Sequence, residues 1–202
     1  MERLIYQNKV FDPYEYSNED EFERVILEHA NDIFGPKSVF INVKKRIGED
    51  NIVTIPDGYI IDFSFEKDPR LYIIEVELVT HDPYKHIGQQ LLRFGISYKA
   101  SGRNIKAFLL ENVLKDKSKR NMVDQGFRKA GLRNIDAFFE SIIFEKPVAA
   151  IVIVDQSTDD LANVKSINDE DRHYRVPEIH FRPKKHFQIY ALSTGDKAIN
   201  RS

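Results

Sequence analysis

The chain has 202 residues, 42% hydrophobic and 31% charged, a composition typical of a soluble globular protein with a substantial core. It contains no cysteine, which excludes a disulfide framework, a thiolate zinc site and a cysteine nucleophile. The net charge is −2, so a nucleic-acid partner would need a local basic surface, because the chain as a whole is not basic.

The first third of the chain is predicted to hold an arm, a helix and two strands. Ser17 or Asn18 caps the helix, because either side chain can accept a hydrogen bond from a first-turn N–H, and Gly35 with Pro36 ends it. The acidic residues that follow the cap are favoured by the helix dipole. In chain order, these elements are expected at residues 1–16, 17–33, 38–47 and 52–65.

The strand predicted at residues 71–79 is apolar except for two glutamates. Glu75 and Glu77 alternate along it, so they share one face. A strand this apolar is normally buried on both faces, where unpaired carboxylates are costly and two neighbouring ones repel. They therefore need a cation, a basic partner or a proton, and hard oxygen ligands of this kind suit Mg²⁺ or Mn²⁺.

Three short motifs follow one another in the order strand, strand, helix. Pro56 and Asp57 open one strand, Glu75-Val76-Glu77 lies on the next, and Gln90 precedes Phe94 by four residues on the following helix. Together they resemble the PD-(D/E)xK nuclease superfamily over about residues 19–110. A glutamate replaces the usual lysine of the motif, as it does in some restriction endonucleases of the superfamily.

This resemblance implies an α/β fold, the three-layer restriction-endonuclease-like arrangement in which helices flank a mixed central sheet. It implies metal-dependent hydrolysis of a phosphodiester, with Mg²⁺ or Mn²⁺ as cofactor, and a DNA endonuclease is the expected activity. Asp57 and Glu75 would be metal ligands, with the carbonyl of Val76 as a third. Glu77 would act on the attacking water or recruit a second metal, and Gln90 would position the water or the backbone.

Two ligand assignments stay open. Asp62 competes with Asp57, since the geometry of a hairpin allows either aspartate to approach the next strand. Members of the superfamily often place a further glutamate on the first helix. Glu23 is the candidate for that role, and Glu19 and Glu28 are the alternatives, although for any single one of them a solvated acidic helix face is the favoured explanation.

A zinc site near His81, Asp82 and His86 has little support, because no HExxH-type spacing is present. His86 lies close to the predicted glutamine position, so it could instead approach a phosphate, and its alternative role is that of an exposed helix residue.

The second half of the chain is predicted to continue the α/β pattern. A helix at residues 83–100 and a strand at 104–111 after a Gly102 turn would form a parallel crossover, and strands are expected at 147–155 and 186–193. Residues 113–146 are helical in pattern and the most basic part of the chain. Either they form a solvated face or, flanking the acidic site, they contact nucleic acid together with His86. The candidate contacts are Lys117, Lys119, Arg120, Arg128, Lys129 and Arg133.

These features indicate one nuclease-like domain over residues 1–202, with a core at about 17–155, a helical basic insertion at 113–146 and an extension at 156–202. No signal-peptide core or membrane-length apolar segment occurs, so a cytoplasmic protein is expected, with DNA and a second copy of the chain as partners. The sequence does not choose between DNA and RNA. Two other hypotheses remain: an inactive nuclease-fold protein that binds nucleic acid or protein, and a generic α/β domain in which basic residues pair with Glu75 and Glu77. Those bases would be Lys44, Lys45 and Arg46.

Overall fold

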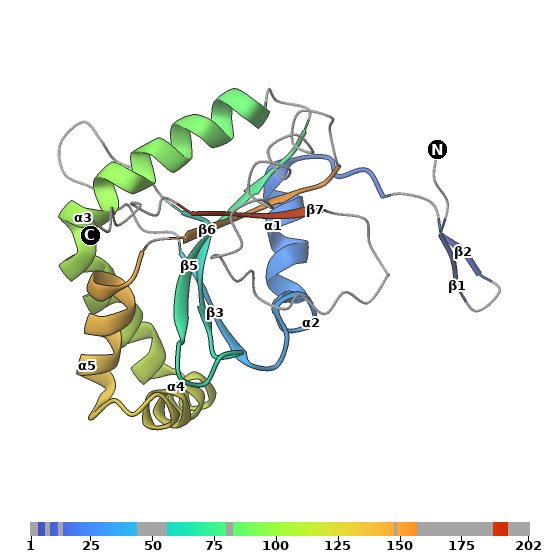
Figure 1. Cartoon of the computed structure of the whole chain (residues 1–202). Helices are drawn as coiled ribbons and strands as arrows, with labels where there is room; N and C mark the ends of the chain where they lie inside the picture. The colour runs from blue at the N-terminus through green and yellow to red at the C-terminus, as the bar shows by residue number, and fades with distance from the viewer. Residues whose placement is uncertain are drawn as a thin grey trace, which may run out of the picture.

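The structure, a computed structural model, is an α/β fold built on one mixed five-stranded sheet (Figure 1). It describes residues 4–6, 9–11, 14–43, 56–79, 83–147, 149–156 and 188–193. The expectations for residues 44–55, 80–82, 157–187 and 194–202 lie outside these ranges. The strand order is β3–β4–β5–β6–β7, and the N-terminal arm contributes a separate antiparallel pair, β1 (Leu4–Tyr6) with β2 (Lys9–Phe11).

The sheet combines antiparallel and parallel neighbours. β3 (Ser38–Asn42), β4 (Gly58–Asp62) and β5 (Arg70–Glu77) are successive antiparallel strands, rich in the β-branched and aromatic residues that favour pleated structure. β5 then pairs in parallel with β6 (Ala149–Val154), and β7 (Gln188–Ser193) runs antiparallel to β6. The strands predicted in each of these regions are therefore confirmed, as is the mixed sheet.

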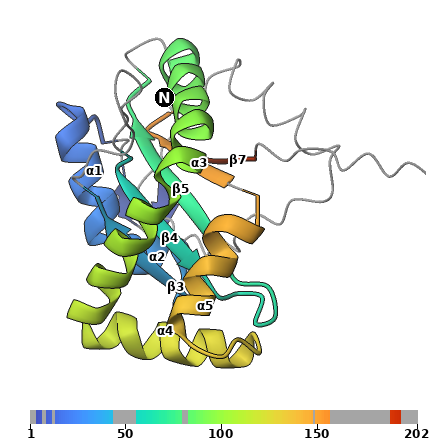
Figure 2. The ribbon, with the colours of Figure 1, turned by 90° about the vertical axis from the view of Figure 1, so that its left-hand side faces the viewer.

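Helices cover both faces of the sheet, as expected (Figures 1 and 2). On one face, α1 (Glu19–Glu28) and α2 (Ala30–Phe34) pack against Ile60, Tyr72, Ile74 and Val76, which we call the α1-side core. On the other face, α3 (Pro83–Lys115), α4 (Lys117–Lys129), α5 (Ile135–Glu140) and the π-helix η1 (Ser141–Glu145) form the α3-side core. Alternate residues of β5 thus enter different cores.

The helix predicted at residues 17–33 is two helices. Asn18 caps α1 as predicted, because its side chain accepts the N–H of Glu21 at 2.9 Å. The backbone leaves helical geometry at His29, where φ is −106° and ψ is 12°, and α2 follows as a short helix. Gly35 ends α2 with a φ of 79°, a left-handed conformation that glycine adopts without strain.

The prediction of a turn at Gly102 and a strand at residues 104–111 was wrong, since α3 runs unbroken from Pro83 to Lys115. Gly102 is a close-packing position rather than a turn: a Cβ there would lie 2.4 Å from Cε1 of Phe144. The buried side chains of α3 recur every three or four residues, which is helical spacing. They are Phe94, Ser97, Tyr98, Ser101, Ile105, Leu109 and Val113. The parallel crossover exists, but its returning strand is β6.

Residues 113–146 are helical, as predicted. Their apolar side chains are part of the α3-side core and cover one end of the sheet. The buried ones are Val113, Val123, Phe127, Phe138, Phe139, Ile142 and Ile143.

Substitution of Gly126 by alanine is expected to lower the free energy of unfolding by about 1–3 kcal/mol, the usual cost of overpacking. A Cβ at Gly126 would lie 2.0 Å from Cε1 of Phe63, and that ring cannot swing away because it stacks on the buried Phe138 at 5.7 Å. Gly95→Ala is the matched control in an open part of α3, where no atom lies within 4 Å of the new Cβ. It should stabilise by about 0.5–1 kcal/mol through helix propensity. Urea denaturation measures both; equal effects would contradict the packing at Gly126.

Candidate functional site

The carboxylate of Asp57 lies against the backbone of β5. β4 starts at Gly58, opposite Ile74, so the remainder of β5 extends past the paired part of β4. Asp57 occupies this position: its N–H donates to the carbonyl of Ile74 at 3.1 Å, and its Oδ2 accepts the N–H of Val76 at 2.7 Å. The register of the hairpin therefore brings Asp57 directly beside the peptide that joins Glu75 to Val76.

Asp62, the competing aspartate, lies at the other end of the same hairpin. It is opposite Arg70, and its Oδ1 accepts both the N–H and the hydroxyl of Ser64, at 2.9 and 2.7 Å. Because β4 is antiparallel to β5, five residues of strand, roughly 17 Å, separate the levels of Asp57 and Asp62. Of the two, the structure brings only Asp57 to Glu75.

Glu75 and Glu77 are almost completely buried, with 3% and 2% of their surfaces exposed. By strand alternation they project from the same face as Leu71 and Ile73, toward the α3-side core. Oε1 of Glu75 is buried and has no hydrogen-bond partner among the described residues. Burial raises the pKa of Glu75 well above its usual value, and the charges of Asp57 and Glu77 raise it further.

Burial also raises the pKa of Asp57 to about 7, although the N–H of Val76 stabilises its charged form. Among charged neighbours, Glu23 raises this pKa most, followed by Glu19 and Glu77. The first helix therefore supplies two carboxylates to the same region, including the predicted Glu23. Glu28, the remaining alternative, is an exposed residue at the end of α1.

We call Glu19, Glu23, Asp57, Glu75 and Glu77 the acidic cluster. Burial, followed by the charges of neighbouring carboxylates, raises the pKa of its two most perturbed members, Asp57 and Glu75. Carboxylate oxygens are the ligands that a hard cation such as Mg²⁺ prefers. Oε1 of Glu75, which is buried and has no partner among the described residues, could coordinate such an ion. As the side chains are placed, no three His, Cys, Asp or Glu residues within the described ranges are arranged to hold a metal ion.

Other predicted site residues are defined only by their backbone. Gln90 and His86 lie in the first turns of α3, which follows β5 after a short connection, and their side chains lie outside the described part of the structure. The N–H of Val76 is engaged by Asp57, and its carbonyl projects from the same edge of β5. His81 and Asp82 of the zinc hypothesis, and Lys44, Lys45 and Arg46 of the ion-pair hypothesis, lie outside the described residues.

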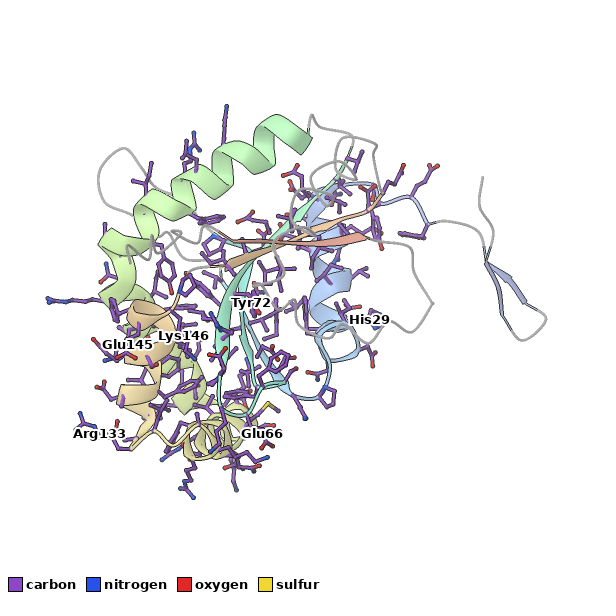
Figure 3. All side chains as sticks on the ribbon, viewed as in Figure 1. His29, Glu66, Tyr72, Arg133, Glu145 and Lys146 are labelled. Atoms are coloured by element: carbon purple, nitrogen blue, oxygen red, sulfur yellow. The ribbon has the colours of Figure 1, made fainter. Side chains whose placement is uncertain are left out.

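The basic residues expected to flank the acidic site lie elsewhere. Nζ of Lys129 is 2.7 Å from the carboxylate of Glu66, which follows β4 at the Asp62 end of the hairpin. Figure 3 shows Glu66 beside α4, with Arg133 at the same end of the molecule. Nε of Arg120 lies 3.9 Å from Asp124, and Arg128 lies 5.8 Å from the centre of the Phe127 ring. α4 and α5 therefore do not flank Asp57 and Glu75, because they pack at the opposite end of β5.

A hollow of about 330 Å³ is also found at this far end, between α4 and the start of β3. Its lining mixes polar and apolar residues and contains no member of the acidic cluster. The lining residues are Pro36, Lys37, Phe63, Glu66, Ser118, Asn121, Met122, Gln125, Gly126 and Lys129.

Two neighbours of the cluster were missed from the sequence. Tyr59 has a buried hydroxyl without a described partner, and its pKa is raised by burial and then by the charges of Tyr98 and Glu75. Asp155, just after β6, accepts the N–H of Val79 at 2.8 Å and so joins the ends of the parallel strands. The signal for Asp155 was its position at the end of an apolar strand, because the carboxyl ends of parallel strands lie at one edge of a sheet.

Comparisons of this chain with protein-family models, with curated protein sequences and with solved structures found no match. Among the helices that the structure describes, none is both long enough and apolar enough to cross a membrane.

Proposed function

We propose that this protein is a metal-dependent nuclease related to the PD-(D/E)xK superfamily, with DNA as its substrate. The observation that supports it best is the meeting of Asp57 and Glu75 from two different strands, with Glu75 offering a buried oxygen that has no described partner. Buried carboxylates with raised pKa values are typical of functional sites, because a structural core has no need of them.

In this proposal, each residue of the motif has a separate task. Asp57 and Glu75 would hold the ion, and the Val76 carbonyl, on the same strand edge as the N–H that Asp57 engages, is a third oxygen within the motif. A bound Mg²⁺ or Mn²⁺ would polarise the phosphodiester and lower the pKa of a bound water. Glu77 would accept the proton of the attacking water, and Gln90 would orient that water or the scissile phosphate.

The direct test is incubation of the full chain with plasmid DNA and with single-stranded DNA in Mn²⁺, beside a chelator control and a Glu75→Ala variant. Cleavage that needs both the ion and Glu75 supports the proposal. Wild-type protein that is folded, binds Mn²⁺ and cleaves neither substrate would refute the DNA nuclease, and an RNA substrate run in parallel tests the remaining nucleic acid.

A second candidate function is a nuclease-fold protein without chemistry, which binds nucleic acid or protein. Two observations favour it. Asp57 already accepts a hydrogen bond from the backbone N–H of Val76. Among the described residues, no three His, Cys, Asp or Glu side chains are placed to hold a metal ion. Calorimetric titration separates the candidates. Absence of Mg²⁺ and Mn²⁺ binding by the folded chain would favour the protein without chemistry, whereas binding that is lost in Asp57→Asn would favour the enzyme.

Glu77→Gln is expected to keep the fold and to lower metal-dependent cleavage by about 10²–10⁴-fold, the effect of losing a general base. The amide has nearly the shape of the carboxylate, so the buried site, 2% exposed in the wild type, stays filled. Single-turnover cleavage rates and melting temperatures of wild type, Glu77→Gln and Glu77→Lys measure both effects. Cleavage that survives Glu77→Gln unchanged would remove Glu77 from the mechanism.

A further inference from the structure

All of α3 except its last five residues carries a distinctive charge pattern. Between Pro83 and Leu110 the chain contains no aspartate or glutamate, although acidic residues outnumber basic ones in the whole protein. The same stretch contains several bases. These are Lys85, Arg93, Lys99, Arg103 and Lys106.

Where the structure describes the side chains of this stretch, the solvent-exposed ones gather on one face. At 100° per residue, the exposed positions fall within about one third of the helix circumference. We call them the α3 face; its residues are Gln89, Leu92, Arg93, Ile96, Ala100, Arg103, Asn104 and Ala107. The opposite side of α3 enters the α3-side core, and Figure 2 shows the helix lying across one side of the sheet.

The two arginines of the α3 face, Arg93 and Arg103, have no partner within the described part of the chain. Neither Arg93 nor Arg103 makes an ion pair or hydrogen bond with any residue that the structure describes, and both are exposed. Four lysines of the described chain are already paired, since each has its Nζ within 2.9 Å of a carboxylate oxygen. These are Lys106, Lys115, Lys129 and Lys146.

The chemistry of the face favours a polyanion. A second copy of α3 would place arginine against arginine, which like-charge repulsion opposes. A lipid surface would need a broad apolar face, and here only Leu92 and Ile96, 67% and 51% exposed, are large and apolar. Arginine, asparagine and glutamine are donors that contact phosphate oxygens, and the exposed Ala100 and Ala107 leave the backbone of the helix approachable.

The position of the face agrees with this chemistry. α3 begins a few residues after Glu77, and Glu75 and Glu77 project toward the side of the sheet that α3 covers. Arg93 and Arg103 are about 15 Å apart along the helix, which corresponds to roughly four base-pair steps of duplex. A nucleic acid along this helix would thus lie over the helix that directly follows Glu77 in the chain, with α3 between it and the buried glutamates.

We infer that the α3 face, through Arg93 and Arg103, is where this protein contacts the phosphodiester backbone of nucleic acid. The inference rests on the proposed function for its substrate class, but it concerns binding, which can be measured without cleavage. Contacts made only to the backbone carry little sequence information, so binding should be strongly salt-dependent and weakly sequence-dependent.

The test is fluorescence anisotropy with a labelled 30-base-pair DNA duplex and its single strand, using the full chain in chelator. Arg93→Ala with Arg103→Ala should weaken binding roughly 30-fold at 0.15 M salt and reduce the slope of log affinity against log salt by about 1.8, since each phosphate contact contributes about 0.9. Replacing both arginines by lysine should restore most of the slope. Lys117→Ala with Arg133→Ala, two exposed bases at the far end, is the control with equal loss of charge and should bind almost as wild type does.

Unchanged binding in the arginine pair, an equal loss in both pairs, or wild-type protein that binds neither DNA would each overturn the inference. Binding to anionic vesicles that depends on Leu92 and Ile96, with no arginine-dependent DNA binding, would assign the face to a lipid surface instead. The two proposals fail separately. If the protein needs Arg93 and Arg103 to bind DNA but never cleaves it, the binding inference stands and the nuclease proposal fails. If it cleaves DNA in Mn²⁺ but binds without these arginines, the nuclease proposal stands and the binding inference fails.

Discussion

Glu75→Gln is expected to reduce metal-dependent cleavage by at least ~10²-fold and, in chelator above about pH 7, to melt at a higher temperature than the wild type. Both effects have one cause. The carboxylate of Glu75 is buried beside Asp57 and Glu77, so its charge destabilises the folded protein unless a cation is bound. Glutamine keeps the shape, removes the charge and takes away the ligand. Loss of activity accompanied by a gain in stability is not expected from simple misfolding.

Stabilisation by the ion should disappear in the same variant. A ligand that binds only the folded state at 100 times its dissociation constant adds about 2.7 kcal/mol to the free energy of unfolding. Melting temperatures of wild type and Glu75→Gln, each with Mg²⁺ and with chelator, measure this gain. Wild type that melts at the same temperature with and without the ion would count against a metal site at Glu75.

Asp62→Asn is the matched control for the loss of a buried carboxylate. Asp62 is 2% exposed and lies on β4 in the same hairpin, but its oxygen is hydrogen-bonded to Ser64 at the far end from Glu75. The asparagine oxygen can accept the same bonds, so this variant should retain cleavage. If Asp62→Asn loses as much activity as Glu75→Gln, the assignment of the ligand to Asp57 rather than Asp62 is wrong.

The stability of the metal-free protein is expected to increase as the pH falls from about 8 to about 5. Folded Asp57 keeps its proton up to a pKa of about 7, whereas the unfolded chain releases it near the ordinary value of 3.8. Between these values the folded state binds more protons, so its stability is greatest at the low end and is lost as the pH rises through 7. One such proton contributes at most about 1.4 kcal/mol per pH unit, and Glu75 acts in the same direction.

The pH dependence is measured as melting temperature in chelator, where about 1 kcal/mol corresponds to roughly 2–4 °C for a chain of this size. Glu21 has the opposite sign because hydrogen bonds from Ser17 and Tyr14 lower its pKa to about 2, but its window lies below that of Asp57. The variant Asp57→Asn with Glu75→Gln should lose most of the slope, and saturating Mg²⁺ should flatten it in the wild type. Stability that instead rises steadily from about pH 5 to 8 would mean that the two carboxylates are already neutralised by a base.

The features that the sequence alone determined are those that depend on neighbouring residues. Period-two alternation places Glu75 and Glu77 on one face of β5, and the structure agrees. The cap at Asn18 and the end of α2 at Gly35 follow from side chains and backbone preferences within one turn. The mixed sheet and the coverage of both its faces by helices followed from successive local patterns of this kind.

The error at residues 104–111 shows where local patterns stop being decisive. A short apolar run reads equally as a strand or as a buried helix, and Gly102 reads as a turn. What fixes the helix is the packing of Phe144 against the glycine and of Ile105 and Leu109 against the sheet. Phe144 is more than forty positions away in the chain, so this contact cannot be seen in a window of sequence.

The composition of the site was likewise decided by tertiary structure. Asp57 and Asp62 are both acidic residues at the ends of one strand, and only the antiparallel register of β4 with β5 brings the first to Glu75 and the second to Arg70. Charge clustering along the sequence pointed to α4, whereas packing placed α4 at the far end and left the arginines of α3 exposed. The sequence specifies which side chains each element carries and on which face. Their distances depend on long-range register and packing, because residues far apart in the chain become neighbours only when the core forms.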